Sequence, residues 1–155
     1  MNIGDVIAVE DVILDLRPEG KTRLLKELAV HAAGRTGCPA AEITSVLAAR
    51  ERLGSTGLGM GVAIPHAKMR ALQRPFGAFV RLGTPCPFEA IDGQDVDLVV
   101  LLLLPEASPQ EHLNVLARIA RLLRDPDAVA RLRQAADAVT IHQVLACSQP
   151  RPAVA

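Results

Sequence analysis

The chain has 155 residues, half of them hydrophobic, which is enough to bury one core and argues against a disordered chain. Seventeen basic residues balance seventeen acidic ones, and there are three Phe but no Trp or Tyr. With neither a basic excess nor aromatic stacking platforms, we expect no nucleic-acid partner.

The cysteines, the N-terminus and the longest apolar run indicate the cellular location to expect for this protein. Cys38, Cys86 and Cys147 are far apart and form no C-x-x-C pair, so neither a zinc site nor a disulfide framework is predicted. The N-terminus lacks the basic and apolar regions of a signal peptide. The apolar run at 98–104 is far shorter than the ~20 residues that span a bilayer. We expect a cytoplasmic protein without membrane insertion.

The first predicted elements are a strand and a helix. Residues 12–16 predict a strand that ends at 18–20. From Lys21 the apolar residues recur at helical spacing, and Gly34 and Gly37 are expected to end this helix. The buried stripe comprises Leu24, Leu25, Leu28, Ala29 and Ala32. His31 lies among polar positions, and we expect it to be solvated.

A second helix is predicted from Pro39, a residue favoured in the first turn, to about Arg52. Its buried stripe is Ile43, Val46 and Leu47, and Arg50 extends that stripe at the helix end. Arg50 either complements the helix dipole or reaches into the following loop, where its planar fork can bind phosphate oxygens. The loop sequence favours the second interpretation.

That loop carries four glycines and leads into a short strand. Glycine permits positive φ and lets backbone amides gather around an anion; the four are Gly54, Gly57, Gly59 and Gly61. Residues 62–64 predict a strand that stops at Pro65, which has a fixed φ and no N–H. His66 follows at once, well placed beside glycine amides and an arginine to carry a phosphoryl group.

Other interpretations of this stretch are a tight connection with a structural histidine, or a nucleotide-binding loop. The nucleotide loop is disfavoured because no Gly-Lys-Ser/Thr ends it and the order is helix, loop, strand rather than strand, loop, helix.

The segments after His66 predict strands and turns. They are a polar connection at 67–75, a strand at 76–82, a break at 83–87, a short segment at 88–91 that pairs briefly, and a turn at 92–93. Residues 96–104 are apolar on both faces apart from Asp97, as expected of a central strand covered by helices.

The next helix has a strong start signal. Ser108 and Glu111 form a predicted capping box, and Pro109 suits the first turn. His112 shares the apolar stripe of the helix, which continues through Leu116, Ile119 and Leu123. By itself this pattern is most often a core or boundary histidine.

Two more helices are predicted, one beginning at Asp125-Pro126 and one over 137–146. His142 borders the stripe of the last helix and is given no role. Together these elements predict a single α/β domain over residues 1–147, with a mixed β-sheet flanked by helices on both faces. The polar, proline-containing tail at 148–155 is predicted to be disordered.

One stretch resembles a known family. Arg50-Glu51, Leu53-Gly54-Ser55-Thr56-Gly57 and Gly61-Val62-Ala63-Ile64-Pro65-His66 closely resemble the active-site signature of the mannitol/fructose-type (type 2) enzyme IIA domains of the bacterial phosphotransferase system. The resemblance covers about residues 1–147. The opening at residues 3–7 is most similar to the nitrogen-regulatory group. One departure is Ala67, where the family usually has Gly.

The resemblance implies a phosphotransferase that works through a phosphohistidine. His66 is the implied acceptor, forming a tele-phosphohistidine with a phosphoryl group from an HPr-like or NPr-like carrier, and His112 faces it. Arg50 then neutralises phosphoryl oxygens, and Ser55, Thr56 and Gly57 supply further hydrogen bonds. No cofactor is expected.

A metal site and a purely structural role are the alternatives to a phosphocarrier, and two functions are open to a phosphocarrier. A metal site on His66 and His112 has too few ligands, and a purely structural or adaptor role leaves the order of the motif unexplained. The protein is expected to act mainly as a nitrogen- and potassium-linked regulator that binds targets such as sensor kinases or potassium-transport proteins. The alternative is a sugar-transport component that passes phosphate to an enzyme IIB domain.

Overall fold

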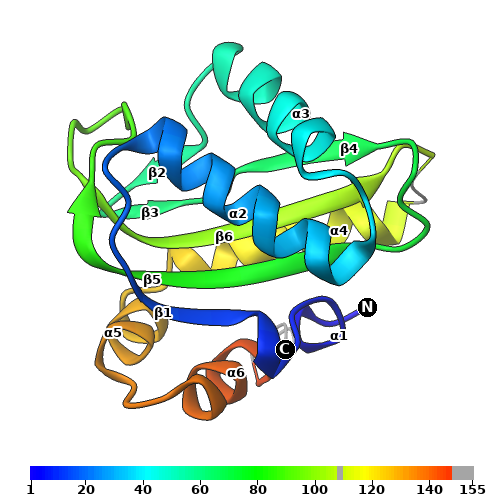
Figure 1. The fold of residues 1–155 in the computed structure, drawn as a ribbon. Coiled ribbons are helices and arrows are strands. Elements are labelled where there is room, and N and C mark those ends of the chain that lie inside the picture. The colour runs from blue at the N-terminus through cyan, green and yellow to red at the C-terminus, as the bar shows by residue number, and fades with distance from the viewer. Residues whose placement is uncertain (108–109, 148–155) are drawn as a thin grey trace.

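A computed structural model describes residues 1–107 and 110–147. A mixed sheet lies between helices, with α2 and α3 in front of it and α4 behind it (Figure 1). The helices are α1 (Ile3–Val6), the short 3₁₀ helix η1 (Val9–Asp11), α2 (Lys21–Thr36), α3 (Ala40–Arg52), α4 (Gln110–Leu123), α5 (Pro126–Gln134) and α6 (Ala138–Ala146). The strands are β1 (Val12–Leu16), β2 (Gly57–Gly59), β3 (Val62–Ala63), β4 (His66–Met69), β5 (Phe76–Cys86) and β6 (Val96–Pro105).

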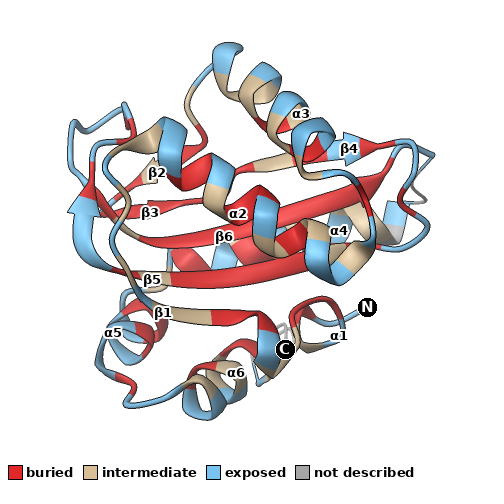
Figure 2. Ribbon diagram, viewed as in Figure 1, coloured by how far each residue is buried: buried red, intermediate tan, exposed pale blue. Residues whose placement is uncertain are grey.

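Strand β6 is the centre of the sheet, whose order is β1-β5-β6-β3-β2. It pairs antiparallel with β5 on one side and parallel with both β3 and β4 on the other. Its side chains alternate between two cores and are buried almost throughout (Figure 2). The prediction of a central strand covered on both faces is therefore confirmed, and so is the mixed α/β fold.

The two cores belong to the two faces of the sheet. One contains side chains of α2 and α3 with Val99, Leu101 and Leu103, and the other contains side chains of α1, α4, α5 and α6 with Leu98 and Leu102. Both are aliphatic apart from a few Phe, as the composition predicts.

Most predicted elements are confirmed, but several boundaries were wrong. Strand β1 and helix α3 lie where predicted, whereas α2 continues past Gly34 and ends at Gly37, whose φ of 81° suits a residue without Cβ. Strand β5 does not stop at Leu82 but continues to Cys86, with a shift of register after Arg81. Its pairing with β1 ends at Leu82, so Pro85 removes no hydrogen bond on that side.

The polar connection predicted after His66 was also wrong in its first residues. They form β4, in which Ala67 and Met69 are buried while Lys68 is exposed. Four residues are too few for this alternation to predict a strand. Conversely, the segment 88–91 forms no strand: Phe88 is buried, Ile91 is almost fully exposed, and Gly93 makes the predicted turn.

The predicted solvation of His31 was wrong. Its Nε2 lies 2.8 Å from Oδ1 of Asp11, and Nε of Arg35 donates to the same oxygen at 2.9 Å. Asp11 is only 2% exposed. The partner comes from η1, far from His31 in the sequence, so the helical pattern around His31 carries no signal of it.

The predicted capping box at Ser108 and Pro109, and the predicted tail at 148–155, lie outside the described residues. So does the side chain of Glu111. The starts predicted for α5 and α6 are confirmed, because Asp125 and Asp137 are their N-caps and accept hydrogen bonds from backbone amides in the first turn.

The cap of α6 gives a pH-dependent prediction. The side chain and the backbone amide of Thr140 donate to Asp137, and these hydrogen bonds lower the pKa of that carboxyl below its ordinary value of 3.8. A lowered folded-state pKa stabilises the fold above the ordinary value, and this contribution disappears as the pH falls through the folded value. Asn caps helices without titrating.

We therefore expect the parent to lose its stability advantage over Asp137→Asn below about pH 4. Melting temperatures of the two proteins across a pH series measure this. A constant difference between them down to the lowest pH would contradict it.

Candidate functional site

His66 is the first residue of β4 and faces α4. It pairs with Leu102 of β6, which belongs to the same core as Val115 and Ile119 of α4. Residues in register on neighbouring strands share a face, and the alternate residue Ala67 belongs to the core under α2 and α3. His66 itself is half-buried.

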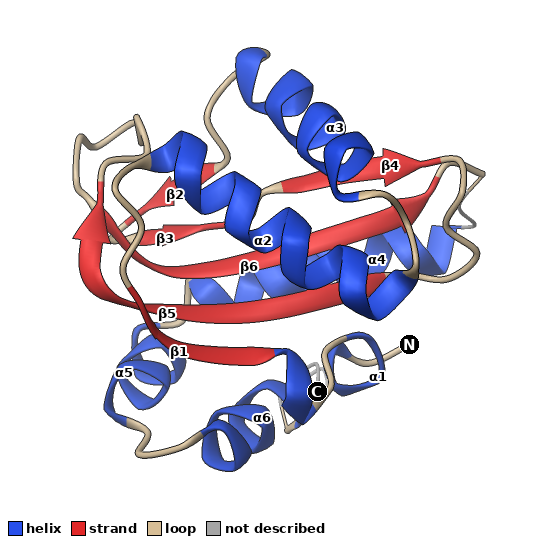
Figure 3. Ribbon diagram, in the orientation of Figure 1, coloured by secondary structure: helices blue, strands red, loops and turns tan. Residues whose placement is uncertain are grey.

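The ring has one anchored nitrogen. Its Nδ1 lies 2.8 Å from the carbonyl oxygen of Ile64. A carbonyl only accepts, so the neutral ring holds its proton on Nδ1 and donates it there, which leaves the lone pair on Nε2. A short loop between β3 and β4 places this carbonyl (Figure 3). Such an imidazole is prepared for nucleophilic attack through Nε2.

His112 lies in the first turn of α4, the helix that covers the face of the sheet bearing His66. The predicted apolar stripe of α4 is confirmed, since Ile119 and Leu123 are buried in the core on this face. Nδ1 of His112 is buried and has no hydrogen-bond partner among the described residues. A buried polar atom without a hydrogen-bond partner destabilises the fold. This nitrogen of His112 is therefore consistent with a ring that hydrogen-bonds an oxygen of an incoming group.

Arg50 does reach the glycine loop. It lies in the last turn of α3, and its Nη1 donates to the carbonyl oxygen of Gly54 at 3.0 Å. Its guanidinium has further donors. Whether they bind phosphate stays a prediction.

The predicted phosphate contacts in the loop are engaged within the protein. Oγ of Ser55 donates to the carbonyl of Phe88 at 2.6 Å and accepts from the amide of Gly57 at 3.1 Å. The hydroxyl of Thr56 donates to the carboxylate of Glu51, and Thr56 is only 6% exposed. Ser55, Thr56 and Gly57 can bind phosphate only if these internal hydrogen bonds are replaced by bonds to the phosphate oxygens. Their role in phosphate binding stays a prediction.

Comparison with known proteins decides the family. The model of the phosphoenolpyruvate-dependent sugar phosphotransferase system, EIIA 2, matches residues 5–147. This chain belongs to that family. It is accordingly a phosphotransferase component that works through a phosphohistidine intermediate.

Individual relatives show which groups within the family this chain resembles. The nitrogen regulatory protein of Bradyrhizobium diazoefficiens is 49% identical over 146 residues, covering 94% of this chain and 95% of that protein. The crystal structure of the nitrogen regulatory protein IIA-Ntr of Neisseria meningitidis is 35% identical with a TM-score of 0.89, over 92% of this chain and 98% of that one. The fructose-specific EIIA component of Haloferax volcanii is 34% identical over 148 residues, covering 94% and 95%. The predicted resemblance to the nitrogen-regulatory group is confirmed.

Sequence reasoning about this EIIA domain missed two charged residues beneath the loop. Nζ of Lys21 lies 2.8 Å from Oε2 of Glu51, and their side chains are 17% and 6% exposed. Glu51 stands in the quoted motif beside Arg50, but nothing in the sequence pairs it with a lysine thirty positions away. The sequence offered one sign of this ion pair, the carboxylate of Glu51 next to the glycine loop.

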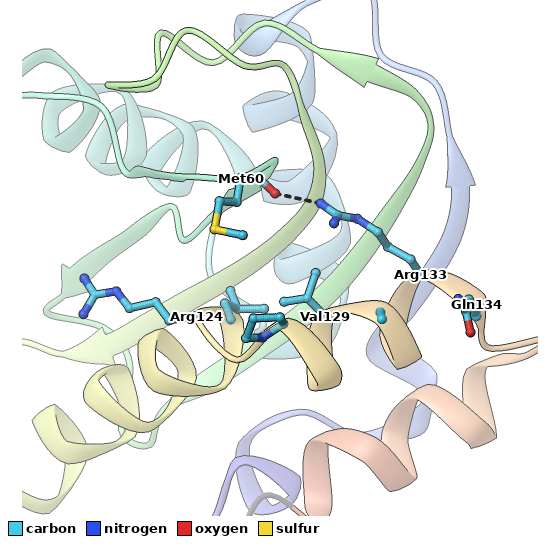
Figure 4. A pocket seen from close by; sticks show the side chains of 8 residues that line it. Met60, Arg124, Val129, Arg133 and Gln134 are labelled. Atoms are coloured by element: carbon cyan, nitrogen blue, oxygen red, sulfur yellow. Dashed lines mark hydrogen bonds between the residues drawn. The ribbon is translucent and has the colours of Figure 1, made fainter.

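A groove of about 240 Å³ lies between the β2–β3 turn and α5 of this EIIA domain (Figure 4). Arg133 closes one side of it by donating to the carbonyl of Met60 at 2.8 Å and by pairing with Asp97. None of the predicted site residues lines it.

Within the described part of the chain, no group of three or more His, Cys, Asp or Glu side chains is arranged to hold a metal ion. The same residues include no helix that is both long and apolar enough to cross a membrane.

Proposed function

We propose that His66 accepts a phosphoryl group on Nε2 from an HPr-like or NPr-like carrier in the cytoplasm, and that the protein acts mainly as a nitrogen- and potassium-linked regulator. The observation that carries the acceptor assignment is the hydrogen bond from Nδ1 of His66 to the carbonyl of Ile64. It fixes the tautomer with its lone pair on Nε2, on the half-buried ring.

The transfer is a displacement at phosphorus. The lone pair of Nε2 attacks, the bond from phosphorus to the carrier's imidazole nitrogen breaks, and its electron pair returns to the carrier. The proton on Nδ1 stays there, where the resulting positive ring is stabilised by the Ile64 carbonyl. Positioning and charge stabilisation dominate such reactions. His112 donates a hydrogen bond to the phosphoryl oxygens, and Arg50 neutralises their charge.

The test is to incubate the full chain with phosphoenolpyruvate, the general phosphotransferase enzyme and its carrier protein. One phosphoryl group is expected, acid-labile and alkali-stable as a phosphoramidate is, and mapped by mass spectrometry of peptides to Nε2 of His66. Label on another residue, or no label, would refute the assignment.

The regulatory role follows from a change of charge. A phosphoryl group adds about one and a half to two negative charges. It would lie near Arg50 and near Lys68, which is exposed on the His66 face of β4 two residues along. Arg70 is also close in sequence, although it is paired with Glu106 at 3.2 Å. The surface would change from basic to neutral or acidic without movement of the fold, and targets complementary to one state would be disfavoured by the other.

We expect His66→Ala and the phosphate-mimicking His66→Glu to recover different partners from a cell extract. Regulatory targets such as a sensor kinase or a potassium-transport protein are expected in one sample and depleted in the other. Quantitative mass spectrometry of the bound proteins measures this. Equal recovery of the same partners by both variants would count against a phosphorylation-dependent regulator.

The second candidate function is sugar transport. It is favoured by the 34% identity to a fructose-specific EIIA component, although the 49% identity to a nitrogen regulatory protein is higher. Rapid transfer of phosphate from the phosphorylated chain to an enzyme IIB domain, combined with equal recovery of partners in the extract experiment, would establish this function instead.

A further inference from the structure

A chain of hydrogen bonds connects the buried ion pair under the glycine loop to His66. It begins at Lys21, the first residue of α2, whose Nζ is 2.8 Å from Oε2 of Glu51 in the last turns of α3. The ammonium also lies 4.4 Å from the ring centroid of Phe88, a cation–π contact that helps to hold the lysine side chain in place.

Glu51 uses both of its carboxylate oxygens on one loop residue. Oε2 accepts the backbone amide of Thr56 at 3.2 Å, and Oε1 accepts the hydroxyl of the same residue. Hydrogen bonds to an ionised acceptor are about twice as strong as neutral ones. Thr56 is therefore fixed both through its side chain and through its backbone.

Thr56 in turn fixes the residue that holds the histidine. The amide of Ile64 donates to the carbonyl of Thr56 at 3.1 Å, and the carbonyl of Ile64 accepts Nδ1–H of His66 at 2.8 Å. Ile64 is 3% exposed and lies between two short strands, where Pro65 supplies no amide of its own. The bond between Thr56 and Ile64 therefore helps to set the direction of the Ile64 carbonyl.

We propose that Glu51, held by Lys21, is the positioning residue of this site: through Thr56 and Ile64 it keeps the proton of His66 on Nδ1 and directs Nε2 to the incoming phosphorus. This inference rests on the proposed role of His66 as acceptor. It assigns to the Lys21–Glu51 pair a part in the transfer reaction, in addition to its part in packing α2 against α3.

Three variants separate the steps of this chain of hydrogen bonds. Glu51→Gln keeps the size of the side chain, but only one of its two terminal atoms can accept, so one donor of Thr56 loses its partner. Thr56→Val removes only the hydroxyl and keeps the ion pair, while Thr56→Ser restores the hydroxyl. If Glu51→Gln does not fold, the two Thr56 variants decide the question alone.

The first readout is the tautomer of His66, measured on the full unphosphorylated chain by ¹⁵N NMR of the imidazole. The parent is expected to hold the Nδ1–H tautomer, Glu51→Gln and Thr56→Val a mixture of both, and Thr56→Ser the parental state. The second readout is the rate of phosphoryl acceptance, expected to fall on the order of 10- to 100-fold in the first two variants and to recover in Thr56→Ser.

Asp11→Asn is the matched control. It removes the charge of another largely buried carboxylate, 2% exposed against 6% for the side chain of Glu51. The partners of Asp11 are His31 and Arg35 of α2, outside the glycine loop. It is expected to lower the melting temperature while leaving the His66 tautomer and the transfer rate at parental values.

Three results would overturn the inference: an unchanged tautomer in Glu51→Gln and Thr56→Val, a changed tautomer with an unchanged rate, or an equal change in Asp11→Asn. Because the tautomer is measured without phosphate, it stays decisive even if His66→Ala still accepts a phosphoryl group. That last result would refute the acceptor assignment alone.

Discussion

We expect His66→Ala to accept no phosphoryl group under conditions that label the parent completely. The substitution removes the nucleophile itself. Two of the other three histidines are engaged elsewhere, Nε2 of His31 with Asp11 and Nε2 of His142 with the carbonyl of Ile7 at 2.8 Å. The third, His112, is proposed to bind phosphoryl oxygens without bonding to phosphorus. Radiolabel or mass shift of the intact chain after transfer from the carrier measures this loss.

The variant is expected to stay folded. His66 is half-buried, and the hydrogen bond lost is the one to the Ile64 carbonyl, worth about 1 kcal/mol. Circular dichroism and thermal melting check this, and His142→Gln serves as a histidine control that should label as the parent does. Full labelling of folded His66→Ala would place the acceptor elsewhere.

His112→Ala and Arg50→Ala are expected to slow transfer on the order of 10²–10³-fold each, while any label still maps to His66. Both residues are proposed to stabilise charge on the phosphoryl group without bonding to phosphorus. His112 offers a buried ring nitrogen without a partner among the described residues, and Arg50 is a cation at the edge of the glycine loop. Single-turnover rates with phosphorylated carrier measure the effect.

Matched controls distinguish this role from general disruption. Arg52→Ala removes an arginine from the same end of α3. Its Nε donates to the carbonyl of Ala48 at 3.4 Å, and the variant should transfer at nearly the parental rate. His112→Asn keeps a donor and should recover part of the rate. Phosphate mapped to His112 in the parent would reverse the assigned roles of the two histidines.

The sequence allowed the large elements of the fold to be predicted because their signals are local. Each of these signals lies within one segment of the chain. They are the helical spacing of apolar residues in α2 and α3, the apolar run of β6 that is buried on both faces, and the N-caps Asp125 and Asp137. Strand β4 was missed because four residues that alternate between Ala67, Met69 and polar side chains become a strand only by pairing with β6.

The site was predictable only as a set of residue types. The order Ile-Pro-His indicated a histidine at a strand end, and the structure adds the carbonyl that fixes its tautomer. The partners of Ser55 and Thr56 were not predictable, since Phe88 and the side-chain direction of Glu51 are set by long-range packing. The same reason explains His31, whose buried partner Asp11 is twenty positions away.

The pairing of β4 with β6 also determines when the site can form during synthesis of the chain. Strands β5 and β6 are consecutive and antiparallel, and such local contacts form fast, whereas the parallel pairing of β3 and β4 with β6 closes a long loop. His66 therefore leaves the ribosome before the strand that supports it exists, and His112 follows later still. A nascent chain stopped before β6 should be a poor phosphoryl acceptor, so acceptance from the carrier would report that β4 has paired with β6.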